Sequence, residues 1–240
     1  FDINDNAEGL VMAIEDISDI NKVKNTFKRY VSKQVVDNLL DDDTKLKLGG
    51  EDREVTILFT DIRGFTAMSE KMEPEKVVLT LNEYFSEMID IVFKYNGTLD
   101  KIIGDCIMAV FEHTDEYNGA DGALNAAISM QNRLDGIRNE MRAVGMPEFY
   151  AGFGINTGLS VVGNVGNKKQ LSRTVLGDPV NLAARVESLS KEGKTSCILF
   201  TESTLSHITE DFQYDFLLEN TVKGKTVPVN IYEIRSAEMA

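Results

Sequence analysis

Two apolar runs, one that leads into an aspartate and one that is broken at an aspartate, constrain the fold of this chain more than any other feature. The first run, Val55 to Phe59, predicts a buried strand, and Asp61 stands where that strand ends. The second run, GTLDKIIGDCIMAVF, predicts two strands joined by a tight turn that contains Asp105. If these strands are neighbours in one sheet, Asp61 and Asp105 lie side by side.

The spacing of apolar residues along the rest of the chain predicts an α+β domain. One helix is expected over residues 74–96, with Gly97 as its stop, and a second over residues 119–144. The order strand, helix, hairpin, helix, strand is that of a ferredoxin-like βαββαβ core with additional strands. Further strands are expected over residues 149–156, 171–176, 195–200 and 229–234. The buried face of the first helix is expected to comprise Val77, Val78, Leu81, Phe85, Met88, Ile89, Val92 and Phe93.

A pair of neighbouring carboxylates at strand ends is a candidate site for divalent cations. Mg²⁺ binds one or two carboxylates together with substrate oxygens, and two such ions can steady the attacking and leaving oxygens of a phosphoryl transfer. Gly64 opens the segment after Asp61, so free backbone N–H groups are expected close to the same corner. A lone aspartate at a strand end is more often a turn or capping residue, so Asp61 alone decides little.

A third stretch, SRTVLGDPVNLAARVE, adds an amide and a guanidinium on one helical face. Pro179 suits the first turn of a helix, and Asn181 and Arg185 are then i, i+4 neighbours. Thr174 precedes this helix in a strand-like segment.

Together, these three stretches resemble the catalytic domain of class III adenylyl and guanylyl cyclases, over about residues 51–236. The resemblance implies the nucleotidyl cyclase fold, a nucleoside triphosphate substrate, and a cyclic nucleotide and pyrophosphate as products. It implies two Mg²⁺ ions, for which Mn²⁺ could substitute, held by Asp61, Asp105 and the carbonyl of Ile62.

The resemblance also implies how the substrate is held. Lys101 and Thr174 match the pair that reads the purine, Asn181 the residue that orients the ribose, and Arg185 the arginine that stabilises the transition state. The triphosphate is expected to contact Gly64, Phe65, Thr66 and, through a lysine that holds the terminal phosphates, Lys223. In the family, the metal ligands come from one protomer and the purine pair, the asparagine and the arginine from the other, so a homodimer is expected.

The choice of base follows from hydrogen-bond inventories. Adenine offers an acceptor at N1 and donors at N6, whereas guanine offers a donor at N1 and an acceptor at O6. Lys101 can only donate, which favours ATP, whereas the hydroxyl of Thr174 can donate or accept. Without the surrounding motif, Lys101 would be a solvated lysine at a strand edge. A guanylyl cyclase, or a catalytically silent domain that serves dimerisation or regulation, remains the alternative function.

Composition excludes several other classes of protein. The chain has 240 residues, 42% of them hydrophobic, which is enough for a full core. A net charge of −14 argues against nucleic acid or an anionic membrane as a general partner. No apolar run approaches the roughly 18 residues of a membrane helix, so a cytoplasmic location is expected, with membrane attachment of a longer protein left open. The two histidines and the two cysteines show no spacing typical of a metal or nucleophilic site.

The N-terminal residues predict a connection to a sensor. Residues 1–19 contain LVMAIEDISDI, which resembles the last strand and exit of a PAS-type sensor domain. Residues 20–50 predict a signalling helix and linker, with apolar residues at 3-4 spacing that favour a parallel two-stranded coiled coil. An amphipathic helix packed on its own domain is the alternative. We therefore expect an upstream sensor in the same chain, and a catalytic domain over residues 51–236 whose first strand follows a polar stretch, residues 41–54.

Overall fold

The computed structural model describes residues 49–70, 72–143, 148–167, 170–220 and 228–235. The predicted sensor remnant, nearly all of the predicted signalling helix and linker, and Lys223 lie outside these residues, so those expectations stay predictions.

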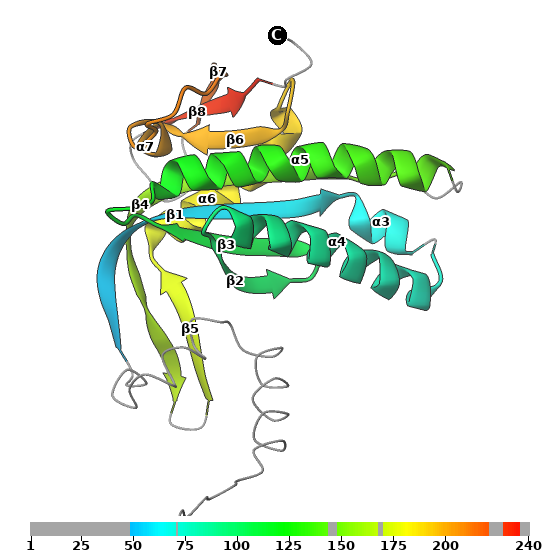
Figure 1. The fold of residues 1–240 in the computed structure, drawn as a ribbon, viewed down its shortest axis with the longest axis horizontal. Coiled ribbons are helices and arrows are strands. Elements are labelled where there is room, and N and C mark those ends of the chain that lie inside the picture. The colour runs from blue at the N-terminus through cyan, green and yellow to red at the C-terminus, as the bar shows by residue number, and fades with distance from the viewer. Residues whose placement is uncertain (1–48, 71, 144–147, 168–169, 221–227, 236–240) are drawn as a thin grey trace, which may run out of the picture. The chain divides into compact units, whose positions relative to one another are not determined.

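The described residues form an α+β domain whose central elements follow the predicted order (Figure 1). A first strand and helix are followed by a hairpin, a long helix and a long strand, which is the ferredoxin-like βαββαβ core. The elements are β1 (Gly49–Arg63), α3 (Phe65–Ser69), α4 (Pro74–Lys94), β2 (Thr98–Ile103), β3 (Cys106–Glu112), α5 (Gly119–Ala143), β4 (Tyr150–Asn167), β5 (Gln170–Leu176), α6 (Asp178–Ser188), β6 (Ile198–Thr201), α7 (Glu202–Leu205), β7 (Tyr214–Asn220) and β8 (Val229–Ile234).

All strands of the described residues belong to one eight-stranded mixed sheet. The order is β2-β3-β1-β4-β6-β8-β7, and β5 pairs with β4 outside this path. β4 and β6 run parallel, whereas β1 runs antiparallel to both β3 and β4. β1 is therefore central, and its end lies between the start of β3 and the start of β4.

The two faces of the sheet carry different helices. Alternate residues of β1 point to opposite faces. Leu58 and Ile62 contribute to the larger core, with α4 and α5, whereas Ile57 and Phe59 contribute to a second core with α6. In Figure 1, α4 and α5 lie in front of the sheet and α6 behind it. Asp61 continues the series of Ile57 and Phe59, so it belongs to the α6 face.

Glycines of β4 allow α6 to lie directly on the sheet. A Cβ atom on Gly154 would overlap the backbone nitrogen of Glu187, and one on Gly152 would overlap the side chain of Ser190. A Cβ on Gly158 would lie 2.9 Å from Cγ of Pro179. These three glycines share one face of β4 because their numbers have the same parity. The missing side chains thus set the position of α6.

The first half of β1 corrects the sequence prediction. Residues 49–54 were expected in a polar linker, but Gly49 pairs with Asn164 and Glu51 with Val162 on β4. Residues 49–54 are all exposed, so this part of the strand has no buried face and no hydrophobic pattern. A polar sequence forms a strand here because β4 provides the hydrogen-bonding partner.

The buried stripe of α4 is narrower than predicted. Tyr84, Met88 and Val92, spaced four residues apart, are buried, although the tyrosine was not in the predicted face. Val78 and Phe93 were expected in that face but are 56% and 51% exposed. The number of apolar residues in this helix therefore predicts a wider buried face than the helix has.

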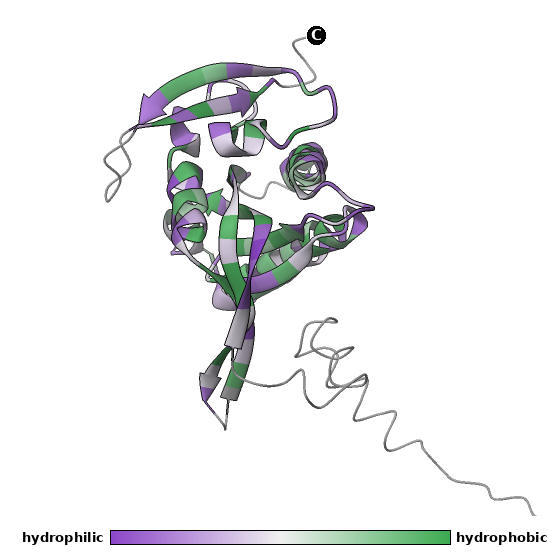
Figure 2. Cartoon of the chain, turned by 90° about the vertical axis from the view of Figure 1, so that its left-hand side faces the viewer, coloured by the Kyte–Doolittle hydropathy of each residue, from purple (hydrophilic) through white to green (hydrophobic). Residues whose placement is uncertain are grey.

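The outer parts of β1, β4 and β5 turn away from the plane of the remaining strands (Figure 1). This extension exposes apolar residues, and Figure 2 colours parts of the projecting strands as hydrophobic. The exposed apolar residues include Leu159, Val161, Val165, Leu171 and Leu176.

Among the described helices, none is both long enough and apolar enough to span a bilayer.

Candidate active site

Asp61 and Asp105 meet at one end of the central strands. β1 pairs with β3 up to Thr60 opposite Ile107, so the end of β1 lies beside the turn that joins β2 to β3. Gly104 in that turn has φ of 66°, a left-handed conformation that glycine adopts without a steric penalty. The predicted neighbouring strands are confirmed, and with them the proximity of the two carboxylates.

The two carboxyls repel each other. Burial, with the charge of Asp105 as the next contribution, raises the pKa of Asp61 to about 6. Burial and the charge of Asp61 also raise the pKa of the Cys106 thiol to about 12. Uncompensated negative charge therefore gathers at this corner, and carboxylate oxygens are the ligands that Mg²⁺ prefers. The residues present fit a divalent cation.

A third carboxyl, Glu187 of α6, also faces this corner and was not anticipated from the sequence. Burial and then the charge of Asp61 raise its pKa to about 7, and the nearby cation of Arg63 partly offsets this. A Cβ on Gly152, the residue opposite Asp61 in the β1–β4 register, would lie 3.0 Å from Oε1 of Glu187. The guanidinium of Arg63 in turn donates to the carbonyl of Ser190, just beyond α6.

Asn181 and Arg185 lie on a different side of α6. With 100° of rotation per residue, Arg185 is turned about 160° and Asn181 about 120° from Glu187 around the helix axis. Since Glu187 faces Asp61, these two side chains project away from the carboxylate pair of their own chain. The predicted helix, with Pro179 in its first turn, is confirmed.

Gly64, Phe65 and Thr66 form the start of α3. Gly64 caps this short helix with φ of 68°, and its carbonyl accepts from the backbone N–H of Met68. The first N–H groups of a helix lack partners within it, so the predicted cluster of donors follows directly after Asp61.

Lys101 and Thr174 are in direct contact although they lie 73 residues apart in sequence. Nζ of Lys101 donates to Oγ1 of Thr174 at 2.8 Å. The lysine side chain is 40% exposed, whereas Thr174 is 6% exposed. A third residue, Asp100, joins them, because its Oδ2 lies 3.0 Å from both Nζ of Lys101 and Oγ1 of Thr174. Asp100 was not among the site residues predicted from the sequence.

A β-bulge explains how Asp100 and Lys101 point the same way. Successive residues of a regular strand point to opposite faces. Between β2 and β3, however, Leu99 pairs with Ala109 and Lys101 with Met108, so the register shifts and Asp100 has no partner residue on β3. Bulges of this kind re-aim side chains next to functional sites.

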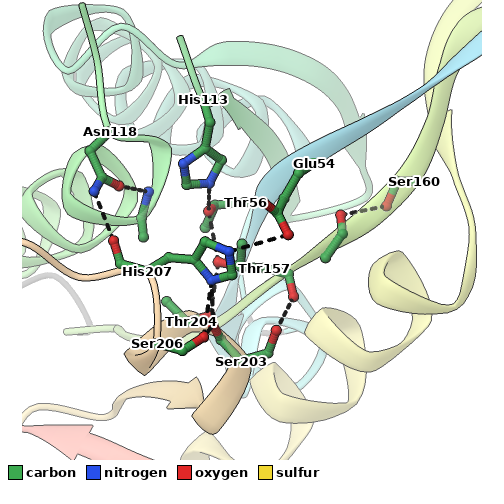
Figure 3. A network of polar contacts seen from close by, with 12 residues as sticks. Glu54, Thr56, His113, Asn118, Thr157, Ser160, Ser203, Thr204, Ser206 and His207 are labelled. Atoms are coloured by element: carbon green, nitrogen blue, oxygen red, sulfur yellow. Dashed lines mark hydrogen bonds and ion pairs between the residues drawn. The ribbon is translucent and has the colours of Figure 1, made fainter. Parts of the chain in front are cut away.

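The two histidines meet in a separate polar network (Figure 3). Their ring centroids are 5.4 Å apart, although the residues are isolated in sequence. Nε2 of His207 lies 3.2 Å from a carboxylate oxygen of Glu54, and Nε2 of His113 lies 3.1 Å from Oγ1 of Thr56. Burial and the neighbouring His207 lower the pKa of His113. Thr56 lies on the face of β1 opposite to Asp61, so this network is not part of the carboxylate site.

Comparison with known families identifies this arrangement. Residues 50–236 match the family described as "Adenylate and Guanylate cyclase catalytic domain". The chain belongs to this family.

The relatives agree with this assignment. The sequence is 38% identical over 228 residues to an adenylate cyclase of Anabaena cylindrica, a match that covers 90% of this chain and 44% of that protein. The chain thus spans less than half of that relative. The crystal structure of the adenylyl cyclase CyaB from P. aeruginosa is 36% identical, with a TM-score of 0.71 over 78% of this chain and 96% of that one. The guanylyl cyclase Cya2 is 34% identical, with a TM-score of 0.70 over 78% and 94%. The predicted nucleotidyl cyclase fold is confirmed.

Proposed function

We propose that this chain is the catalytic domain of an adenylyl cyclase that converts ATP to 3′,5′-cyclic AMP and pyrophosphate. The choice between ATP and GTP rests on the site, since the identities to CyaB and Cya2, at 36% and 34%, are nearly equal. The observation that carries the proposal is the hydrogen bond from Lys101 to Thr174. The same chain also brings the carboxyl groups of Asp61 and Asp105 together. The ammonium of Lys101 donates and therefore suits N1 of adenine but opposes the N1–H of guanine.

Side chains of the protein position the reacting groups. Asp61, Asp105 and the carbonyl of Ile62 would hold two divalent cations, and the chemistry these supply is to neutralise the triphosphate and acidify the attacking 3′-hydroxyl. Asn181 orients the ribose through its amide. The planar, permanently charged fork of Arg185 stabilises the charge that develops on the oxygens of the α-phosphate as pyrophosphate leaves. Gly64, Phe65 and Thr66 would contact the triphosphate through backbone donors, and the role of Lys223 stays a prediction.

The active site is proposed to be shared between two copies of the chain. Asn181 and Arg185 project away from the carboxylate pair of their own protomer, because Glu187 occupies the side of α6 that faces Asp61. A two-fold axis would place them against the carboxylate pair of the partner and generate two equivalent sites. The apolar side chains exposed along the β4–β5 extension offer surface for such an interface.

The test is an assay of the purified chain with ATP or GTP, in the presence of Mg²⁺ or Mn²⁺, for both cyclic nucleotides and for pyrophosphate. We expect cyclic AMP and pyrophosphate in equal amounts, and a requirement for the metal. Predominant cyclic GMP would instead assign a guanylyl cyclase. If folded, dimeric protein forms neither cyclic AMP nor cyclic GMP, a regulatory module would be favoured. An upstream sensor and a cytoplasmic location remain part of the proposal.

A further inference from the structure

The hydrogen bonds around Thr174 remove the ambivalence of its hydroxyl group. A hydroxyl has one proton to donate and two lone pairs that accept. The carboxylate of Asp100 can only accept, so the hydroxyl proton of Thr174 points to Oδ2 of Asp100, at 3.0 Å. One lone pair accepts from Nζ of Lys101, at 2.8 Å. One lone pair remains, so Thr174 can only accept from a further partner.

The same count applies to Lys101. An ammonium group has three protons and no acceptor. One proton is directed at Thr174 and one at Oδ2 of Asp100, 3.0 Å away. One proton remains for a ligand. The pair therefore presents one donor, from Lys101, and one acceptor, from Thr174.

This pattern matches one purine only. Adenine places an acceptor at N1 next to a donor at N6, which pairs with the donor of Lys101 and the acceptor of Thr174. Guanine places a donor at N1 next to an acceptor at O6, so both contacts would be mismatched. A buried mismatch of this kind is costly because polar groups remain unpaired.

Asp100 is held firmly enough to impose this orientation. Its side chain is 5% exposed, and its Oδ1 accepts from the backbone N–H of Val175 at 3.3 Å. The two carboxylate oxygens thus have different partners, one on the backbone of β5 and the other on the Lys101–Thr174 pair. The bulge in β2 leaves Asp100 without a partner residue on β3 and lets it reach across to β5.

We propose that Asp100 is a positioning residue that makes the purine-reading pair selective for adenine, because it holds the hydroxyl proton of Thr174 away from the base. This inference rests on the proposed function, since it assumes that Lys101 and Thr174 contact the purine.

The test is the substitution Asp100→Asn. The side-chain oxygen of the Asn would still accept the hydrogen bond from the backbone N–H of Val175. Its amide nitrogen would then take the place of Oδ2 and donate to the hydroxyl of Thr174. The threonine proton would then be free to turn toward O6 of a guanine. We expect the ratio of kcat/KM for ATP to that for GTP to fall about 10-fold. Inosine triphosphate presents N1–H and O6 without a 2-amino group, so the ratio of kcat/KM for ATP to that for inosine triphosphate should fall by the same factor. Asp90→Asn, at an exposed carboxylate of α4, is the control and should leave the ratio unchanged.

A double-mutant cycle tests whether the effect passes through Thr174. In a Thr174→Val background there is no hydroxyl to orient, so adding Asp100→Asn should change the ratio less than about 2-fold. If the Asn variant turns over too slowly, binding of α,β-methylene analogues of ATP and GTP by calorimetry supplies the same ratio. If Asp100→Asn does not fold, Asp100→Ser offers a second variant that removes the charge.

Failure of this inference can be told from failure of the proposed function. A wild-type chain that forms no cyclic AMP, or prefers GTP, overturns the proposed function. A wild-type chain that prefers ATP while Asp100→Asn keeps that preference overturns the role of Asp100 alone. An equal loss of selectivity with and without the Thr174 hydroxyl would also overturn it, since Asp100 would then act on Lys101 only.

Discussion

The Lys101 ammonium lies 2.8 Å from the Thr174 hydroxyl, although β2 and β5 are not paired in the sheet. Through the strand pairing, Lys101 lies opposite Met108 of β3, which in turn lies opposite Phe59 of β1. Thr174 lies opposite Gly163 of β4, which lies opposite Gly50 of β1. The two residues are therefore at different levels along β1. The two side chains meet because the strands of the extension bend away from the rest of the sheet (Figure 1).

Replacement of Lys101 tests base reading. A carboxylate in Lys101→Glu cannot donate to N1 of adenine but can accept from N1–H of guanine. We expect kcat/KM for ATP to fall about 10- to 100-fold and that for GTP to fall much less. Lys94→Glu, at an exposed lysine of α4, is the matched charge reversal and should affect neither substrate. Unchanged ATP kinetics would show that Lys101 does not contact the base.

Removal of the Asp61 charge should raise the thermal stability of the metal-free protein and abolish turnover. The pKa of Asp61 is raised to about 6, so the folded, metal-free protein binds a proton more tightly than the unfolded chain. Its stability therefore falls as the pH rises from about 4 through about 6. Asp61→Asn removes this loss, and Tm at pH 7.5 in EDTA should rise by about 2–4 °C, after allowance for solvent screening.

The same Asp61→Asn variant should have no measurable cyclase activity, because a ligand of the metal is lost. Asp90→Asn again serves as the control for both measurements. Retained turnover would rule out Asp61 as a metal ligand, whereas a lower Tm would show that its charge is compensated within the fold.

Mixing two inactive variants tests the shared site. Asp61→Ala and Arg185→Ala each spoil both sites of their own homodimer. In a mixed dimer, one site contains neither substitution, so part of the activity should return. The control is a mixture of Asp61→Ala with Asp105→Ala, whose substitutions affect the same half of the site: there, each site of the mixed dimer would carry one of the two substitutions, so no activity should return.

A shared site gives opposite expectations for the two mixtures, because only Asp61→Ala with Arg185→Ala should recover activity. If each chain formed its own site, neither mixture would recover activity. Mass spectrometry should establish that mixed dimers have formed. Mixed dimers of Asp61→Ala with Arg185→Ala that stay inactive would contradict the shared site.

The half-buried His113 predicts a contribution to acid sensitivity. Burial and the neighbouring His207 lower the pKa of His113, while Glu54 and Asp121 act in the opposite direction. The unfolded chain therefore binds a proton more tightly than the folded protein, and stability is lost as the pH falls below about 6.5. His113→Gln should lose less stability than the wild type between pH 7 and pH 5, by thermal melting. Parallel curves for the two proteins would contradict this prediction.

The contact of α6 with the sheet predicts a strong effect of a single methyl group. Gly154→Ala would place its Cβ against the backbone of Glu187, which cannot move without shifting the helix. We expect a loss of about 3 kcal/mol and a fall in Tm on the order of 10 °C. Gly136→Ala in α5 is the control, since its Cβ meets only the end of the Arg133 side chain and alanine favours helix. A small effect at Gly154 would show that α6 is free to move.

The sequence by itself determined the parts of the molecule that depend on local periodicity. The apolar run from Val55 to Phe59 predicted a buried strand that leads to Asp61, and the glycine turn before Asp105 predicted the hairpin. The spacing of Pro179, Asn181 and Arg185 predicted one helical face. These features need only the period of a strand or a helix.

Only the tertiary structure decided which distant residues meet. The bulge at Asp100 depends on the register between β2 and β3, and the contact of that residue with Thr174 depends on the bend of the extension. The approach of Glu187 to Asp61 depends on the glycines beneath α6. The polar start of β1 is a strand because of its partner and not because of its own sequence. None of these relationships has a periodic signal, because each is set by the packing of segments far apart in the chain.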